Sequence, residues 1–473
     1  MAANRRKNLG IVVGINLLLA AIWWWLPLWM YGVFDDGMFY ACIARNLVYD
    51  AQETIWDLKV SNALDASFNG HPPLNFWIQA LFFKLLGDVY WVERVYSLLL
   101  ALCSMGLLVA CWRLFQRDGA RLALLFWLTV PMVGWSFGNN LLENLLTIWT
   151  AGAVYSLVVA ARQERPQWYW IALALCCLCA AAMTKGPTGL FPLAVPFGYA
   201  LLVDHKRWKY ALWTTLSLLA GLVGAYFLLT TVSPRGAAFL ARYWELQVVG
   251  SLTGQDSLAP HRFYVLQSLI EEFLPALLIG LLLQCIAYYL KLTTAKIPKQ
   301  HVFFLLWVAV CASFPLLISP KQLRFYIVPS MFWYALAWGL ACWPALVALV
   351  EYSQSWIRRQ QFSKGILGLG LIGCLIMGYQ NAGKNAREPA LLGDVRKVGA
   401  LAERHSTIHI SASLYRKWNL HAYFYRYYYI DLNTVFQEQT YMLAPKEEDF
   451  DRPGYRRSTL DLQELQLYER VWE

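Results

Sequence analysis

Charged residues are scarce in this chain. Only 15% of its 473 residues are Asp, Glu, Lys or Arg, and 58% are hydrophobic. Soluble domains usually contain about 25% charged residues. Several apolar runs also approach the roughly 20 residues that a helix needs to cross a bilayer. This composition excludes an ordinary soluble domain and predicts an all-α polytopic membrane protein.

The chain has no cysteine after Cys374. The C-terminal region therefore cannot contain a disulfide, and the sequence offers no disulfide framework. The densest cysteine group, Cys176–Cys179, lies inside an apolar run. Buried thiols that pack as small apolar groups explain it better than a metal site does.

Two further features are missing from the sequence. No small-residue cleavage site follows the first apolar run, so Leu9–Trp29, preceded by the basic Asn4–Lys7, is predicted to be an uncleaved signal-anchor. No internal repeat is evident, which argues against a transporter built from inverted repeats.

The net charge of +10 comes largely from short basic loops between apolar runs. Such loops are expected on the cytoplasmic side of a membrane. The charge is thus explained by topology, and we expect no nucleic-acid partner. The basic loops are residues 113–121, 162–165, 204–209, 291–299 and 358–359.

About eleven apolar runs are predicted to cross the bilayer, following the length rule of about 20 residues. With a cytoplasmic N-terminus the basic loops fall on the cytoplasmic face, and the odd number of spans puts the C-terminus outside. Residues 74–87 are short and aromatic and contain Lys84, so we expect an interfacial helix there. The predicted spans are 9–30, 91–114, 122–138, 144–161, 168–183, 189–203, 210–231, 268–290, 301–318, 327–350 and 365–380.

Three long segments collect on the external side of this topology. They are residues 31–90, residues 232–267 and the C-terminal region 382–473. The last contains the strand-like run Thr407–Ala412 followed by an aromatic stretch, which predicts a small extracytoplasmic α/β domain. Residues 1–381 form the predicted transmembrane domain.

An acidic pair, Asp35 and Asp36, directly follows the first apolar run. Carboxylates are strongly disfavoured in hydrocarbon, so ionisable groups at a membrane are functional candidates. The structural alternative is that the acidic pair only marks where the first helix leaves the bilayer.

Further polar residues map to the same external side. Carboxylates beside cations suit the transfer of a group from a phosphate-bearing donor. A carboxylate can take a proton from an acceptor hydroxyl, and cations can offset the charge that develops on a phosphate leaving group. The converging residues are Asp35, Asp36, His71, Asn139, Asn140, Glu143, Lys185, Lys321, Arg324 and Tyr326.

Several of these candidates have a structural alternative. Glu143 could be a helix-start acid favoured by the helix dipole, and Lys185 could simply extend to the interface. His71 precedes two prolines and so has an extended backbone. Its pairing with the acidic residues favours a functional role. Positive charge at Lys321 and Arg324 opposes the topological trend on the external side, which also favours function.

These motifs, in this order, resemble the GT-C glycosyltransferases, and most closely the protein mannosyltransferase and lipid A aminoarabinose transferase group. Asp35–Leu47 resembles the acidic motif and the amphipathic helix after it. Phe68–Trp77 resembles the group's Lys-Pro-Pro-Leu or His-Pro-Pro segment. Glu143–Thr147 stands where the group carries a second acid, and Thr184–Pro187 and Lys321–Pro329 also fit.

The resemblance implies a polyprenyl-phosphate sugar as donor and transfer with inversion on the outer face of the membrane. It implies that Asp35 is the catalytic base or orients the acceptor, that Asp36 supports it and that Glu143 is the second acid. The residues that it implies for the donor phosphate or substrate are His71, Lys185, Lys321, Arg324, Tyr326 and Arg262.

The sequence departs from the family pattern at three points. Gly70 replaces a glutamate implicated in metal binding in the aminoarabinose branch, and His71 replaces its lysine. A divalent metal is therefore left open, with His71 as its candidate ligand, and no other cofactor is implied. The arginine of the loop 232–267 could be either Arg242 or Arg262.

The predicted function is sugar transfer from an undecaprenyl-phosphate donor to an acceptor hydroxyl or phosphate at the periplasmic face of a bacterial inner membrane. The acceptor would be a lipid, a glycan or a protein. Residues 1–381 would be the catalytic domain. Two alternatives remain: a lipid-linked sugar flippase or transporter, and a glycan polymerase or ligase. A flippase predicts essential charges deep in the membrane, whereas the candidates here cluster near span ends.

Overall fold

The computed structural model describes residues 10–50, 54–64, 67–163, 167–254, 259–352, 357–448 and 452–471. The basic residues at 4–7 and Arg165, which were assigned to the cytoplasmic side, lie outside the described residues. The side chains at 358–359 are also outside this description.

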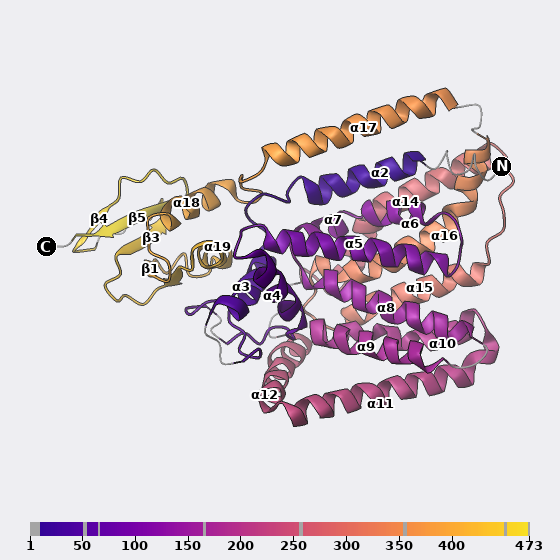
Figure 1. The fold of residues 1–473 in the computed structure, drawn as a ribbon, viewed down its shortest axis with the longest axis horizontal. Helices are drawn as coiled ribbons and strands as arrows, with labels where there is room; N and C mark the ends of the chain where they lie inside the picture. The colour runs from indigo at the N-terminus through magenta and orange to yellow at the C-terminus, as the bar shows by residue number, and fades with distance from the viewer. Residues whose placement is uncertain are drawn as a thin grey trace.

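Long apolar helices form most of the molecule (Figure 1). Within the described residues, seven helical runs are long and apolar enough to cross a membrane, or eight if a pair bent by 75° counts as one span. The bent pair is α6 (Ala120–Leu128) and α7 (Pro131–Gly138). The seven runs are α5 (Val92–Arg113), α8 (Leu142–Arg162), Trp168–Leu202, His205–Val232 with α11 (Trp208–Val232), α14 (Tyr264–Tyr289), Lys299–Leu317 with α15 (Lys299–Ser313), and Arg324–Tyr352 with α16 (Val328–Tyr352).

The run Trp168–Leu202 reverses direction at Gly186. Gly186 has a φ of +64°, a conformation that glycine adopts without strain. A Cβ on Gly189 would lie 2.8 Å from the Cβ of Ala181, so the chain folds back along the preceding helix. The returning part, with 9 residues in a 3-10 helix and 8 in an α-helix, covers about 30 Å. The elements are α9 (Trp168–Lys185), η2 (Gly186–Ala194) and α10 (Val195–Leu202).

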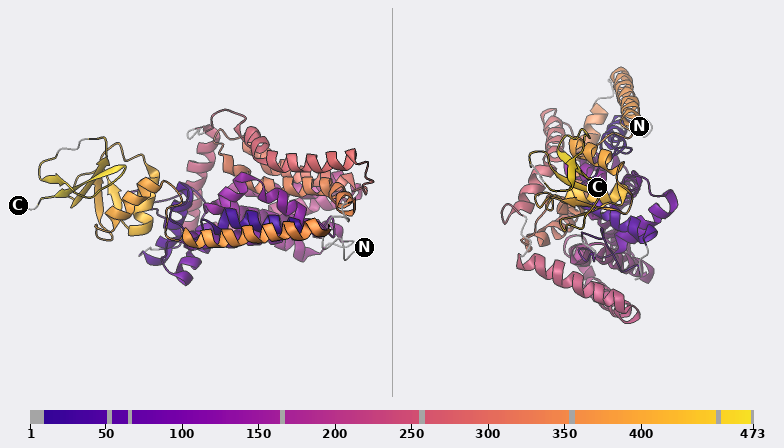
Figure 2. Two further views of the ribbon diagram at one scale, coloured as in Figure 1. Left: turned by 90° about the horizontal axis from the view of Figure 1, so that it is seen from above. Right: turned by 90° about the vertical axis from the view of Figure 1, so that its left-hand side faces the viewer.

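Two further helices with shorter apolar stretches lie side by side along the bundle (Figures 1 and 2). They are α2 (Gly10–Ala20), continued by η1 (Ala21–Trp25), and α17 (Ile357–Gln380). To the seven long runs we add the bent pair as one pass, the second arm of the reversal as one, and α2 and α17 as one each. Counted in this way, the described residues contain eleven passes, the number predicted from the sequence. The helix α4 (Leu74–Leu86) spans only about 20 Å and is too short to cross.

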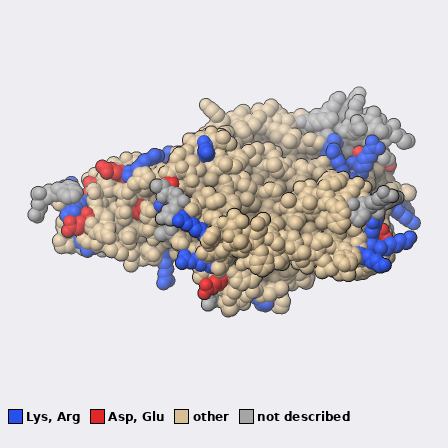
Figure 3. All heavy atoms as spheres, turned by 60° about the horizontal axis from the view of Figure 1, so that its bottom comes forward, with Lys and Arg blue, Asp and Glu red and all other residues tan. Residues whose placement is uncertain are grey.

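Charged side chains avoid the middle of the bundle. On the face drawn in Figure 3, they gather toward the two ends and leave a broad uncharged band between them. Large apolar side chains are exposed on the outer helices, including Trp213 and Phe227 of α11 and Leu282 of α14. Such a surface is suited to lipid, so the chain is a multi-pass membrane protein.

Short helices cover one end of the bundle (Figure 1). They come from the two segments predicted as external loops, residues 31–90 and 232–267. The amphipathic stretch that follows the acidic pair lies within the first of these helices, α3 (Asp35–Tyr49). The other helices are α4, α12 (Pro234–Tyr243), η4 (Trp244–Val249) and α13 (Gly250–Thr253).

The C-terminal region is a mixed α/β domain, as predicted, and it projects from the same end of the bundle (Figure 2). Its sheet has the strand order β2-β1-β3-β5-β4. The strand β1 pairs in parallel with β2 and β3, whereas β5 is antiparallel to β3 and β4. The elements are α18 (Pro389–Gly399), β1 (Thr407–Ile410), α19 (Trp418–Tyr428), β2 (Asp431–Asn433), β3 (Tyr441–Pro445), β4 (Tyr455–Arg457) and β5 (Leu465–Arg470).

Two fully buried arginines join the C-terminal domain to the rest of the molecule. Arg426 of α19 forms ion pairs with Asp88, at 2.8 Å, and with Glu93 of α5, at 2.9 Å. Arg45 of α3 donates hydrogen bonds to the carbonyl oxygens of Tyr425, at 2.7 Å, and Arg426, at 2.9 Å. The domain is therefore fixed to α3, the helix that begins with the acidic pair.

Candidate active site

The first turn of α3 is held against the turn between α7 and α8. The Phe34 N–H donates to the Asn139 Oδ1 at 2.8 Å, and the Asn140 Nδ2 donates to the Gly37 carbonyl at 2.8 Å. A Cβ on Gly37 would clash with the carbonyl oxygen of Asn139. The close approach thus requires glycine, and it places the acidic pair over the start of α8.

We expect Gly37→Ala to destabilise the protein by about 1–3 kcal/mol, because the methyl group meets backbone that cannot move aside. The apparent melting temperature of the purified protein measures this loss. Gly106→Ala in α5 is the matched control, because a Cβ there meets no atom within 4 Å. A similar loss in both variants would contradict the proposed packing constraint.

Asp36 is the member of the acidic pair that faces the other candidates. Burial and the negative charge of Glu143 raise the pKa of Asp36 to about 6, while the positive charges of Lys185 and Lys321 act in the opposite direction. A carboxyl group with this pKa exchanges its proton close to neutral pH. Asp36 is therefore suited to act as a base.

Glu143 and Lys185 form a buried ion pair. Glu143 lies in the first turn of α8 and Lys185 is the last residue of α9, so each charge also suits its helix dipole. Their side chains are only 2% and 9% exposed. The Lys185 Nζ lies 4.0 Å from the ring centroid of Tyr326, which adds a cation–π contact.

A small cavity of about 20 Å³ adjoins this ion pair, enough for about one water molecule. Glu143, Lys185 and Tyr326 line it together with apolar residues of η2 and α15. The charged pair thus borders a confined space rather than bulk solvent.

His71 lies beside this group as a neutral side chain. Burial and the positive charges of Lys185 and Lys321 hold the pKa of His71 well below its usual range. Its ring centroid is 5.8 Å from that of Tyr40, in an edge-to-face arrangement. A neutral imidazole can donate a hydrogen bond without adding charge.

Lys321 extends the positive charge of the site. It lies in the loop before η6 (Arg324–Ile327), and its Nζ is 3.5 Å from the Oε1 of Gln247 in η4. Electrostatic effects of Lys321 reach both Asp36 and His71. The site therefore combines one ionisable carboxyl group, one buried ion pair and a second lysine.

Asp35 has different neighbours from Asp36. Burial raises the pKa of Asp35, the positive charge of Arg387 lowers it and the negative charge of Glu388 raises it. Arg387 lies two residues before the start of α18, and its guanidinium lies 5.2 Å from the ring centroid of Phe34. The acidic pair is thus divided between the bundle side and the C-terminal side.

Two other candidates are engaged outside the cluster. Arg324 pairs with Glu271 and, at 3.3 Å, with Glu272, both on α14. Arg262 is exposed and donates to the carbonyl of Ile318 at 3.2 Å. Arg324 follows Lys321 by three residues, and Arg262 contacts the loop before Lys321 through Ile318. In the described part of the chain, neither arginine pairs with an acid of the cluster.

Three residues of this region are not among the candidates predicted from the sequence: Tyr40, Tyr243 and Arg387. Tyr40 lies one helical turn after Asp36, a spacing that puts both on one face of α3. A Cβ on Gly186 would clash with the Tyr243 hydroxyl, so α12 closes over the turn that carries Lys185. Nothing in the local sequence pairs Arg387 with Asp35, because 352 positions separate them.

The sequence leaves His71 open as a metal ligand, but His71 does not belong to a cluster of potential metal ligands in the described residues. No group of three or more His, Cys, Asp or Glu side chains there is placed to hold a metal ion. The ring neighbours of His71 are Tyr40 and Phe68.

The chain is similar to known proteins in part of its sequence and in its fold. Residues 70–233 match the family described as dolichyl-phosphate-mannose-protein mannosyltransferase. The fold is similar to that of ArnT from Cupriavidus metallidurans bound to undecaprenyl phosphate, with a TM-score of 0.64, 15% identity and 98% of each chain covered. The apo structure of the same ArnT gives a TM-score of 0.62, 15% identity and coverage of 97% of this chain and 98% of that one.

A third structure shares the fold more loosely. It is the apo oligosaccharyltransferase of Archaeoglobus fulgidus, with a TM-score of 0.51, 12% identity and coverage of 90% of this chain and 64% of that one. No curated protein matches the chain in sequence. The chain thus shares the fold of ArnT, and a third of its length matches the mannosyltransferase family.

Proposed function

We propose that this protein moves a sugar from a polyprenyl-phosphate donor of the undecaprenyl class to an acceptor hydroxyl group. The observation that carries the proposal is the cluster at the end of the bundle, where Asp36 lies among Glu143, Lys185 and Lys321. A base beside two cations is what the departure of a phosphate from a sugar requires.

The proposed reaction is a single displacement at the anomeric carbon. The acceptor oxygen forms a bond to this carbon while the bond from the carbon to the phosphate oxygen breaks. The acceptor proton moves to Asp36, and the electron pair leaves with the polyprenyl phosphate. One displacement inverts the configuration at the anomeric carbon.

The cations have the complementary role in this proposal. Lys185 and Lys321 stabilise the negative charge that develops on the departing phosphate, and neutral His71 donates a hydrogen bond to it. Glu143 keeps Lys185 in position through their buried ion pair. Arg324, Tyr326 and Arg262 border this donor side, Arg324 and Arg262 on the segments next to Lys321.

A lipid-linked donor suits the position of the cluster. The cluster lies where the helical bundle meets its layer of short helices, so a donor phosphate could lie there while its tail stays among the outer apolar helices. The similar ArnT structure contains undecaprenyl phosphate, which supports the same class of donor here.

The acceptor side is assigned to the junction with the C-terminal region, residues 382–473. Asp35 and Arg387 lie there, on the other side of the α3 start from Lys185. In this proposal Asp35 orients the acceptor and residues 382–473 help to select it. Residues 1–381 contain the proposed catalytic centre.

The proposed location is the inner membrane of a bacterium, with a cytoplasmic N-terminus and the catalytic end and C-terminal domain in the periplasm. The basic loops at 113–121, 204–209 and 291–299 support this orientation, because positive loops favour the cytoplasmic side. The site then lies on the opposite, external face.

The proposed function is tested with the purified full-length protein in lipid nanodiscs. The protein is offered undecaprenyl-phosphate sugars together with lipid, glycan and peptide acceptors. We expect release of undecaprenyl phosphate and an inverted anomeric configuration in the product, measured by mass spectrometry and NMR. Movement of the intact donor across the bilayer without its cleavage would favour a flippase instead.

We expect the transfer rate to depend on pH through Asp36. A base with a pKa of about 6 is protonated below that pH, so kcat/KM should fall as the pH drops below about 6. Because Glu143 raises this pKa, Glu143→Gln should move the acidic limb to lower pH. Rates between pH 4 and 8 for the two proteins measure the shift. An acidic limb near pH 4, the ordinary range of Asp, would contradict the assignment.

A further inference from the structure

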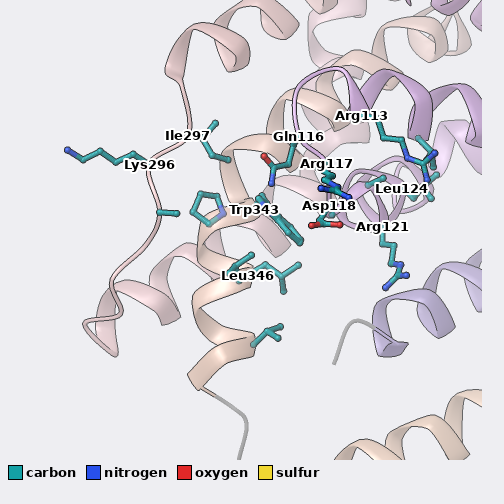
Figure 4. A pocket seen from close by; sticks show the side chains of 17 residues that line it. Arg113, Gln116, Arg117, Asp118, Arg121, Leu124, Lys296, Ile297, Trp343 and Leu346 are labelled. Atoms are coloured by element: carbon teal, nitrogen blue, oxygen red, sulfur yellow. The ribbon is translucent and has the colours of Figure 1, made fainter. Parts of the chain in front are cut away.

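A large cavity in the described part of the chain lies at the end of the bundle remote from the candidate site. Its volume is about 1100 Å³, at the upper limit of ordinary small-molecule pockets of about 300–1000 Å³. It is bounded by the end of α5, the start of α6, the loop before α15, and α16 (Figure 4). The helix α5, with its 22 residues, separates the cavity from the catalytic end by about 30 Å.

Three arginines form one side of this cavity. Arg113, Arg117 and Arg121 lie four positions apart around the turn from α5 to α6, and all three line the cavity. Within the described residues, none of them has an ion-pair partner, although Asp118 lies among them. Lys296 stands on the opposite rim with its side chain directed outward (Figure 4). The cavity therefore has a strong excess of positive charge.

The turn that carries the arginines is held in a defined shape. The Trp112 Nε1 donates to the carbonyl of Asp118 at 2.9 Å, and the side chain of Asn16 donates to the carbonyl of Arg121 at 2.9 Å. Gly119 has a φ of +101° and packs so closely on Trp343 that a Cβ would clash with the indole ring. The positively charged wall is thus preformed.

The other wall of the cavity is apolar. It consists of side chains on α16 that include Trp343, Leu346 and Val347. A small hydrated anion would gain nothing from this wall, whereas an acyl chain would. The cavity also lies at the end of membrane-spanning helices, where a phospholipid headgroup meets hydrocarbon.

We infer that this cavity binds an anionic phospholipid, with its phosphate against Arg113, Arg117 and Arg121 and part of an acyl chain along α16. Basic pockets between membrane helices are suited to such headgroups. The site differs from the candidate active site in position and in residues, so its lipid is a resident of the membrane rather than the sugar donor.

The test uses the full-length protein purified in a neutral detergent. Native mass spectrometry measures how much phosphatidylglycerol and how much phosphatidylcholine stay bound when both are offered in equal amounts. We expect selective retention of phosphatidylglycerol. The triple variant Arg113→Gln, Arg117→Gln and Arg121→Gln should bind it about a hundredfold more weakly, since each cation near an anionic lipid contributes roughly a fivefold effect.

A matched control removes three cations elsewhere at the same end of the bundle. It combines Lys206→Gln, Arg207→Gln and Lys209→Gln, which do not line the cavity, and it should retain phosphatidylglycerol as the parent protein does. Equal loss in the two triple variants would overturn the proposal, because the effect would be one of general charge. The elution volume and apparent melting temperature of both variants verify that they fold.

Two further measurements distinguish the source of the phosphate. Millimolar inorganic phosphate should not displace the lipid. Phosphatidylglycerol with brominated acyl chains should quench part of the tryptophan fluorescence of the protein, and this part of the quenching should be absent in Trp343→Phe. Displacement by inorganic phosphate would show a free-anion site and overturn the proposal. Equal retention of phosphatidylcholine would overturn it as well.

Discussion

Replacement of Asp36 by Asn is expected to lower kcat for sugar transfer by about 10²- to 10⁴-fold, the usual contribution of a general base. The amide keeps the shape of the side chain but cannot accept the acceptor's proton. Because Asp36 is destabilised as an anion by burial and by Glu143, the neutral amide should not reduce stability. Release of polyprenyl phosphate from the donor measures the loss.

Asp35→Asn is the matched control, since it makes the same chemical change one residue away. Its neighbours are Arg387 and Glu388 rather than the lysines of the donor side. We expect it to raise the KM for the acceptor while kcat falls by less than in Asp36→Asn. If the larger loss of kcat follows Asp35→Asn, the base is Asp35, as the family resemblance alone implies.

Much of the fold could be predicted from the sequence because membrane helices are specified by local properties. Apolar length and loop charge together predict eleven passes, and within the described residues seven helical runs, or eight with the bent pair, are long and apolar enough to cross a membrane. The predicted short helix at residues 74–87 is present as Leu74–Leu86. The reversal at Gly186 was also within reach, since Gly186 and Pro187 interrupt an apolar run that is too long for one span. The details of the C-terminal sheet were not, because its strand order depends on contacts between distant residues.

The candidate site could be predicted as a set of residues but not as a geometry. Asp36, Glu143, Lys185 and Lys321 were identified because charges at span ends are costly unless they have a role. Which member of the acidic pair faces Lys185 depends on the rotation of α3. That rotation is set by tertiary contacts, namely the close approach of Gly37 to Asn139.

The same rotation depends on the C-terminal domain through Arg426, which leads to the second large effect. Arg426→Gln should destabilise the protein by about 3–5 kcal/mol, because it leaves Glu93 buried without its counter-charge. The apparent melting temperature should fall, and limited proteolysis should release the C-terminal domain more readily. Transfer should also fall, since Arg45 of α3 donates to the carbonyl of Arg426.

Two comparisons separate this cause from a general loss of charge. Arg470→Gln breaks an exposed pair with Glu438 in the same domain, and such pairs contribute at most about 1 kcal/mol. Adding Glu93→Gln to Arg426→Gln removes the uncompensated carboxylate, so the double variant should be more stable than Arg426→Gln alone. A double variant with the sum of the two single losses would mean that Arg426 acts through packing. If the double variant is instead more stable than Arg426→Gln alone, the charge of Arg426 is what matters. The buried ion pair then fixes the position of α3, and with it that of Asp36, relative to the C-terminal domain.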